Sequence, residues 1–223
     1  EVFAIDTAGS RDAVAPLFVS DFPVDMSFVR FNKNSLSISH RLSSRLTSGK
    51  YLQTENTSAE VADASMTFDF MDGWKNTVGT DVQDVAWMFK RAKGFFDVVA
   101  YTGYTSDKNY IPHNLGVVPE MMLVKGRTAV YNWAVYHKTL GGSDGLKLDT
   151  SGAAQGSTSW WYYEDPTDTH MSLSGSSMAS PSHNYIAYLF ATLANISKVC
   201  SYTGNGTSQT IDAGFSTGSK FIL

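Results

Sequence analysis

The sequence predicts an all-β protein made of tandem antiparallel β-sandwich repeats that are jelly-roll-like. Short runs rich in β-branched and aromatic residues recur along the chain, each bounded by Gly, Asn, Asp, Ser or Pro. Few windows carry the 3.6-residue apolar period of an amphipathic helix. Apolar residues make up 43% of the 223-residue chain, which is enough to form substantial cores. The repeats either stack as separate sandwiches or interleave into one larger sandwich.

An internal repeat supports this fold class. Residues 86–103 recur in diverged form as residues 187–204, and both copies end in Tyr-Thr-Gly. The same comparison places His40 and His137 at equivalent positions, each followed by a cationic residue. Small insertions between such landmarks are what surface loops tolerate. A repeat that has diverged this far is typical of preserved architecture, and the paired histidines are expected to make a repeated structural contact.

The repeat predicts three segments of chain. Residues 1–97 form a first β-sandwich repeat, residues 98–198 a second, and residues 199–223 the start of a third, truncated repeat. In the third segment, residues 221–223 match residues 121–123 of the second. The chain is therefore expected to be a piece of a longer tandem array.

The strands expected within each unit are apolar or aromatic runs between turn-forming residues. In the first unit they lie at residues 26–31, 35–40, 65–70, 85–89 and 96–101. In the second unit they lie at residues 120–125, 131–137, 146–149, 159–163, 170–173, 185–190 and 198–202. Residues 76–81, 104–113 and 174–182 are expected to be loops.

Composition excludes several classes of partner. The formal net charge is −4 and no stretch is strongly basic, so the sequence argues against nucleic acid as a partner. No apolar run is long enough to span a membrane. The single Cys200 lies in an apolar run and is expected to be a buried thiol, and one cysteine builds no disulfide framework. No cofactor is indicated.

Four consecutive aromatic residues are the main candidate contact site. Trp160, Trp161, Tyr162 and Tyr163 fall in an expected strand, where alternation sends two rings to each face. One face would enter the core, and the other would offer rings to a glycan or to a neighbouring subunit. The sequence leaves these two occupants open.

The densest cluster of polar residues comes directly after the four aromatic residues in the sequence. Glu164, Asp165, Asp168 and His170 supply oxygen and nitrogen atoms for a hard cation, but their spacing matches no standard calcium loop. No pair of acidic residues is marked as a glycosidase pair, and no Gly-x-Ser-x-Gly elbow is present. We therefore predict neither a metal site nor an enzyme.

Several segments together resemble repeat modules of bacteriophage tail-fibre and related virion structural proteins, especially those of marine phages. The similar segments are residues 101–103, 113–125, 132–137, 148–151, 185–191 and 202–207. The resemblance covers most of residues 86–223 and is thinner over residues 1–85.

This resemblance implies a structural component of the virion, most simply a tail-fibre or tail-associated protein that contributes to host attachment. Its implied partners are copies of itself in a homo-oligomer such as a trimer, other virion proteins, and host surface glycan. It supplies no catalytic residues. Two alternatives stay open: a carbohydrate-binding module of a larger protein, and a capsid or neck decoration protein.

Overall fold

The computed structural model of the chain describes residues 1–8, 16–33, 37–76, 84–156 and 160–223. Within these residues it contains fifteen β-strands and one short 3-10 helix, η1 (Arg45–Thr47). All pairs of strands are antiparallel. The predicted all-β antiparallel class is therefore confirmed. In the described part of the chain, no helix is long and apolar enough to cross a membrane.

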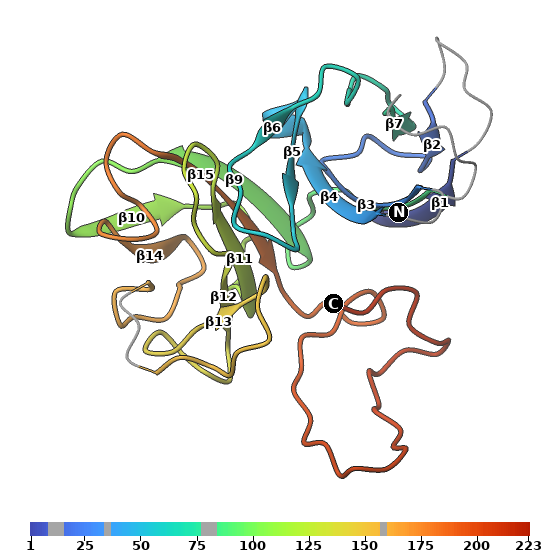
Figure 1. The fold of residues 1–223 in the computed structure, drawn as a ribbon. Helices are drawn as coiled ribbons and strands as arrows, with labels where there is room; N and C mark the ends of the chain where they lie inside the picture. Colours follow the sequence, from blue (N-terminus) through green and yellow to red (C-terminus); the bar gives the residue numbers. More distant parts are fainter. Residues whose placement is uncertain (9–15, 34–36, 77–83, 157–159) are drawn as a thin grey trace.

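Two large sheets form the body of the molecule (Figure 1). The first runs from edge to edge as β1 (Phe3–Thr7), β8 (Val85–Phe89), β3 (Met26–Lys33), β4 (Ser37–Ser44), β5 (Lys50–Gln53) and β6 (Val61–Ala62). The second runs as β9 (Phe96–Thr102), β15 (Asn184–Phe190), β11 (Met121–Gly126), β12 (Ala134–His137) and β13 (Leu146–Lys147). The order of the second sheet therefore matches the order of the first as far as β5. In the first half the first large-sheet strand, β1, pairs with the last, β8; in the second half β9 pairs with β15 in the same way.

Two small sheets complete the two halves. β2 (Phe18–Val19) pairs with β7 (Gly73–Trp74), and β10 (Lys108–Pro112) pairs with β14 (His170–Ser174). In the first half, Phe18 and Trp74 share a buried core with Val29 and Met88 of the large sheet. The corresponding core of the second half contains Ile111, Met171, Leu173, Met122, Val124 and Leu189. Each half is thus a small sheet packed on one face of a large sheet, as in a sandwich.

The opposite faces of the two large sheets pack against each other. Successive side chains of a strand point to opposite faces, so Val29 enters the first sandwich while Phe28 faces the second sheet. The buried residues of this shared core include Met26, Leu42, Leu52, Phe89, Phe96, Val98, Leu123, Trp133, Val135, Ile186 and Tyr188. The two halves consequently bury a third apolar core between them.

Polar contacts join the two sheets beside β6. The Glu60 carboxylate accepts hydrogen bonds from Arg127 Nε and from Lys50 Nζ, each at 2.7 Å. The Glu60 backbone N–H donates to the Arg127 carbonyl at 2.8 Å. Trp133 Nε1 donates to the Gln53 carbonyl at 2.8 Å. These contacts fix the β11 and β12 side of the second sheet against the β5 and β6 side of the first.

Most expected strands are confirmed, with small shifts at their ends. These are the strands expected at residues 26–31, 35–40, 85–89, 96–101, 120–125, 131–137, 146–149, 170–173 and 185–190. Residues 35–36 of the second of these lie outside the described residues. The expected loop at residues 104–113 is wrong over its second part, because that part forms β10. The expected loop at residues 76–81 lies almost wholly outside the described residues.

Three expected strands are wrong. Residues 65–70 form only an isolated bridge, from Thr67 to Lys75. Residues 160–163 form a turn, and residue 159 lies outside the described residues. Residues 198–202 form no strand and pair with neither large sheet. The expected burial of Cys200 in that segment is also wrong, since its side chain is exposed.

The expected equivalence of the two histidines is wrong as well. Met26 of β3 and Met121 of β11 each pair with the last residue of the neighbouring strand, β8 or β15. Across the hairpin, Met26 pairs with Ser44 whereas Met121 pairs with His137. Matched by strand order, His137 therefore corresponds to Ser44 and not to His40. The hairpin from Met26 to Ser44 spans two more residues than the hairpin from Met121 to His137, and this difference in length puts the sequence comparison out of register.

Candidate functional site

Exposed tyrosines gather on the outer face of the β10–β14 sheet. Alternation along β10 buries Asn109 and Ile111 and turns Lys108 and Tyr110 outward. Tyr110 keeps 50% of its surface exposed although it lies in the middle of a strand. With neighbours from two loops it forms what we call the tyrosine face, which consists of Tyr104, Lys108, Tyr110, Tyr162 and Glu164.

Lys108 is the centre of the tyrosine face. Its Nζ lies 4.6 Å from the ring centroid of Tyr110 and 5.1 Å from that of Tyr162. The same ammonium forms an ion pair with Glu164. The hydrogen bond to Glu164 raises the pKa of Lys108 and lowers the pKa of the Glu164 carboxyl. Glu164 also accepts a hydrogen bond from Ser172 Oγ at 3.0 Å, so both charges are held in place.

The ring positions are fixed by further contacts. Tyr162 Oη donates to Asp107 at 2.5 Å, and this bond raises the pKa of the Tyr162 phenol. Tyr104 Oη accepts a hydrogen bond from the Tyr110 backbone N–H at 2.9 Å. The Tyr110 ring meets the His170 ring edge-on at 5.0 Å. The face thus presents rings, hydroxyls and charges in a preorganised arrangement.

The four consecutive aromatics do not alternate as expected. Tyr162 and Tyr163 have φ angles of 52° and 57°, which is left-handed backbone and ends any extended run. Trp161 is fully buried, and its Nε1 donates to the Asp144 carbonyl at 3.0 Å. Trp160 is half-buried against the same core. Trp161 is therefore a core residue and no contact residue, whereas Tyr162 and Tyr163 lie at the surface.

The acidic cluster is dispersed by the fold. Glu164 binds Lys108, while Asp165 accepts a hydrogen bond from Tyr136 Oη at 3.0 Å. His170 Nδ1 lies 3.0 Å from Thr167 Oγ1, and Asp168 is exposed. Within the described ranges, no three His, Cys, Asp or Glu side chains are grouped so that they could hold a metal ion.

Sequence reasoning found only part of this surface. From the aromatic run it named Tyr162 and from the acidic cluster Glu164, but it missed Tyr104, Lys108 and Tyr110, because residues 104–113 were expected to be a loop. The available signal was the alternation at residues 108–112, which Pro112 obscured. In the small sheet of the first half, the described strands β2 and β7 contribute only four residues, and none of the four is a tyrosine.

Together the fold and the surface define a β-sandwich protein whose second half carries an exposed tyrosine-rich face. The sequence matches, over residues 73–221, the family described as Domain of unknown function (DUF7483), and the chain belongs to that family. The matched range begins at β7 and includes the whole second half. Neither the search of curated proteins nor that of solved structures gave a match.

Proposed function

We propose that the chain is a structural protein of a bacteriophage virion, a tail-fibre or tail-associated component that contributes to host attachment. The resemblance over residues 86–223 suggests this class. The matching strand order of the two large sheets supports tandem copies of one building block, which suits a structural role. The location of the protein would then be the virion. Because such proteins attach through many weak contacts, homo-oligomers would gain affinity by multivalency.

The exposed tyrosine face is the observation that carries the attachment role. A sugar presents an apolar ring face edged by hydroxyls, so it suits a surface where aromatic rings adjoin fixed donors and acceptors. Tyr110 and Tyr162 supply rings, while Lys108, Glu164 and Asp107 supply charged hydrogen-bonding groups. We therefore propose host surface glycan as the ligand of this face.

Replacing Tyr110 by alanine is expected to weaken glycan binding about tenfold, the effect of losing one aromatic contact of roughly 1.4 kcal/mol. Tyr202→Ala is the matched control, because Tyr202 is 68% exposed and lies outside the tyrosine face. A glycan array identifies the ligand, and calorimetric titration gives its Kd for each variant. Equal affinity of the wild type and Tyr110→Ala would contradict the proposed site.

The virion assignment has its own test. Mass spectrometry of purified phage particles is expected to detect peptides of this chain, and antibody labelling in electron micrographs is expected to mark the tail. Labelling of the capsid or neck would favour the decoration protein instead. Absence from particles, combined with saturable glycan binding by the monomer, would favour the carbohydrate-binding module of a larger protein.

A further inference from the structure

The charged groups of the tyrosine face are arranged with their acidic members outward. The Lys108 side chain keeps 16% of its surface exposed, whereas that of its partner Glu164 keeps 47%. Asp107, whose carboxylate accepts the hydrogen bond from Tyr162 Oη, is also exposed. One covered ammonium and two outward carboxylates therefore leave an excess of negative charge at this surface.

Lys108 is already engaged on several sides. Its ammonium pairs with Glu164 and lies over the rings of Tyr110 and Tyr162. Glu164 is held in turn by the hydrogen bond from Ser172 Oγ, so it does not turn away freely from Lys108. An anionic group of a ligand reaches this ammonium only by displacing Glu164 from both contacts. The carboxylate of Glu164 thus occupies the position in which an acidic sugar would bind.

Asp107 adds a second carboxylate to the face. Among the residues that the structure describes, no Lys, Arg or His nitrogen forms an ion pair with it. An ionised carboxylate only accepts hydrogen bonds, so Asp107 and Glu164 suit the O–H donors of a sugar. A carboxylate or sulfate on the ligand supplies no donor at neutral pH and adds a like charge, which is repelled. The face therefore favours hydroxyl groups over acidic groups.

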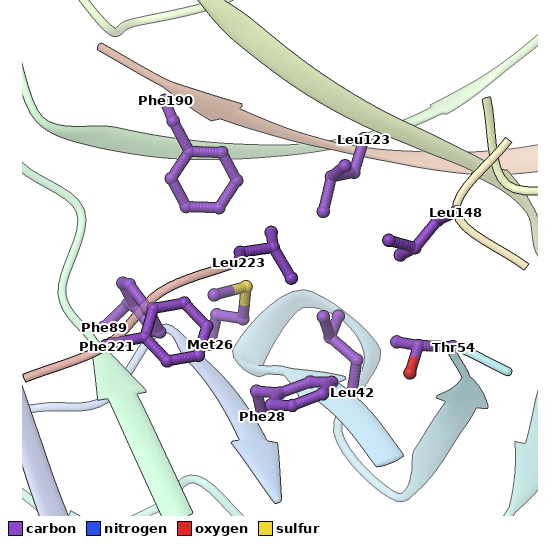
Figure 2. A pocket seen from close by; sticks show the side chains of 10 residues that line it. All are labelled: Met26, Phe28, Leu42, Thr54, Phe89, Leu123, Leu148, Phe190, Phe221 and Leu223. Carbon is purple, nitrogen blue, oxygen red and sulfur yellow. The ribbon is translucent and has the colours of Figure 1, made fainter. Parts of the chain in front are cut away.

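The apolar groove between the two large sheets does not compete for such a ligand (Figure 2). Among the described residues that line it, Thr54 is the one with a polar side chain, and the others include Met26 and Leu123. Phe221 and Leu223 of the same chain also enter this groove. A sugar placed there would lose its hydrogen bonds to water without replacing them. The tyrosine face is consequently the better surface for a glycan.

We propose that the tyrosine face binds neutral glycans and discriminates against glycans that carry carboxylate or sulfate groups. This inference rests on the proposed glycan-binding function and names the ligand class of that same face. The rings of Tyr104 and Tyr110 meet the apolar faces of neutral sugars, while the outward carboxylates accept hydrogen bonds from their hydroxyls. An acidic glycan loses part of the second contribution and meets repulsion instead.

A glycan array of matched sets tests the ligand class. Each neutral oligosaccharide is printed beside two counterparts, one with its primary alcohols oxidised to carboxylates and one with these alcohols sulfated. The chain is expected to bind neutral members. Calorimetric titration is expected to give their acidic counterparts a Kd about tenfold higher, the size expected for like charges a few ångströms apart at a protein surface. Raising the salt concentration is expected to narrow this ratio, because salt screens exposed charges.

Two variants that each remove one negative charge connect the discrimination to this face. Glu164→Gln removes the carboxylate that competes with an acidic ligand, and Asp107→Asn removes the one without an ion pair. Both replacements keep a side-chain oxygen that accepts a hydrogen bond. Each is expected to lower the ratio of the acidic to the neutral Kd severalfold. Asp69→Asn is the matched control, because Asp69 is exposed in the first half, and its ratio is expected to equal that of the wild type.

Failure of this inference differs from failure of the proposed function. Acidic members that bind as tightly as their neutral counterparts, or a ratio that neither variant changes, would overturn the neutral class while glycan binding stands. A chain that binds no member of the array contradicts the glycan-binding function itself, and the ligand class falls with it.

Discussion

Replacing Trp133 by alanine is expected to lower the free energy of unfolding by about 3–5 kcal/mol, the range for losing a fully buried tryptophan. Trp133 has no exposed surface and stacks on Tyr188, with ring centroids 6.3 Å apart. Its Nε1 also donates to the Gln53 carbonyl of the first sheet, so the substitution leaves that carbonyl without its donor. The loss removes both packing and a polar link from the core that the two halves share.

The measurement is denaturant unfolding followed by circular dichroism, with Trp133→Phe as the matched variant. Phenylalanine keeps an aromatic ring but not the N–H donor, so its cost is expected to be about 1–3 kcal/mol. The alanine variant is also expected to separate the unfolding of the two halves, because their shared core is weakened while their own cores stay intact. An alanine variant within about 1 kcal/mol of the wild type would show that the shared core contributes little.

The long central strands were predictable from sequence because their patterns are strong. The apolar runs of β3, β8, β11 and β15 are bounded by turn formers, and the large sheets bury both of their faces. The failures depend on tertiary context. The run Trp160 to Tyr163 has high strand propensity, yet it has no neighbouring strand and instead turns through left-handed backbone.

Only two residues of the candidate site were predictable from sequence, and both lie in the segment that precedes β14. Tyr162 stood out as part of an aromatic run and Glu164 as part of an acidic cluster, but a site on a sheet face depends on which strands pair. Tyr110 lies opposite Ser172, and Glu164 reaches Lys108 across the edge of β14. Such pairing joins residues far apart in the sequence, and no local pattern marks it. The burial of Trp161 was hidden for the same reason.

The two halves match in strand order but do not contact each other reciprocally. Trp133 of the second half reaches the Gln53 carbonyl of the first. Its counterpart by strand order is His40, which instead stacks on Phe28 of its own sheet at 5.7 Å. An interface of two equivalent faces would repeat each contact in both directions. The non-reciprocal arrangement leaves part of the first sheet's face uncovered, and Phe221 occupies that part.

A second large effect is expected from Lys125, whose side chain is fully buried between the halves. Its Nζ donates to the Thr57 carbonyl at 3.0 Å and to the Gly126 carbonyl at 3.3 Å. Burial lowers the pKa of Lys125 from 10.5 to about 8, although the charge of Asp149 opposes the shift. The charged form is therefore less favourable in the folded protein than in the unfolded chain.

The sign of the pH effect follows from proton binding. Between about pH 8 and pH 10.5 the unfolded chain holds this proton more strongly than the folded protein, so the contribution of Lys125 to stability rises with pH across that window. The free energy of unfolding of the wild type minus that of Lys125→Met is expected to increase from pH 7 to pH 10 by up to about 3 kcal/mol. Other titrating groups cancel in this difference.

Lys93→Met provides the control, because Lys93 is exposed and lies away from the Lys125 carbonyl partners. Its stability difference from the wild type is expected to change little with pH over the same range. A Lys125→Met difference that is equally flat would mean that the ammonium is well solvated in the folded protein. It would also contradict the close packing of β11 against the segment around Thr57, since that packing is what removes Lys125 from water.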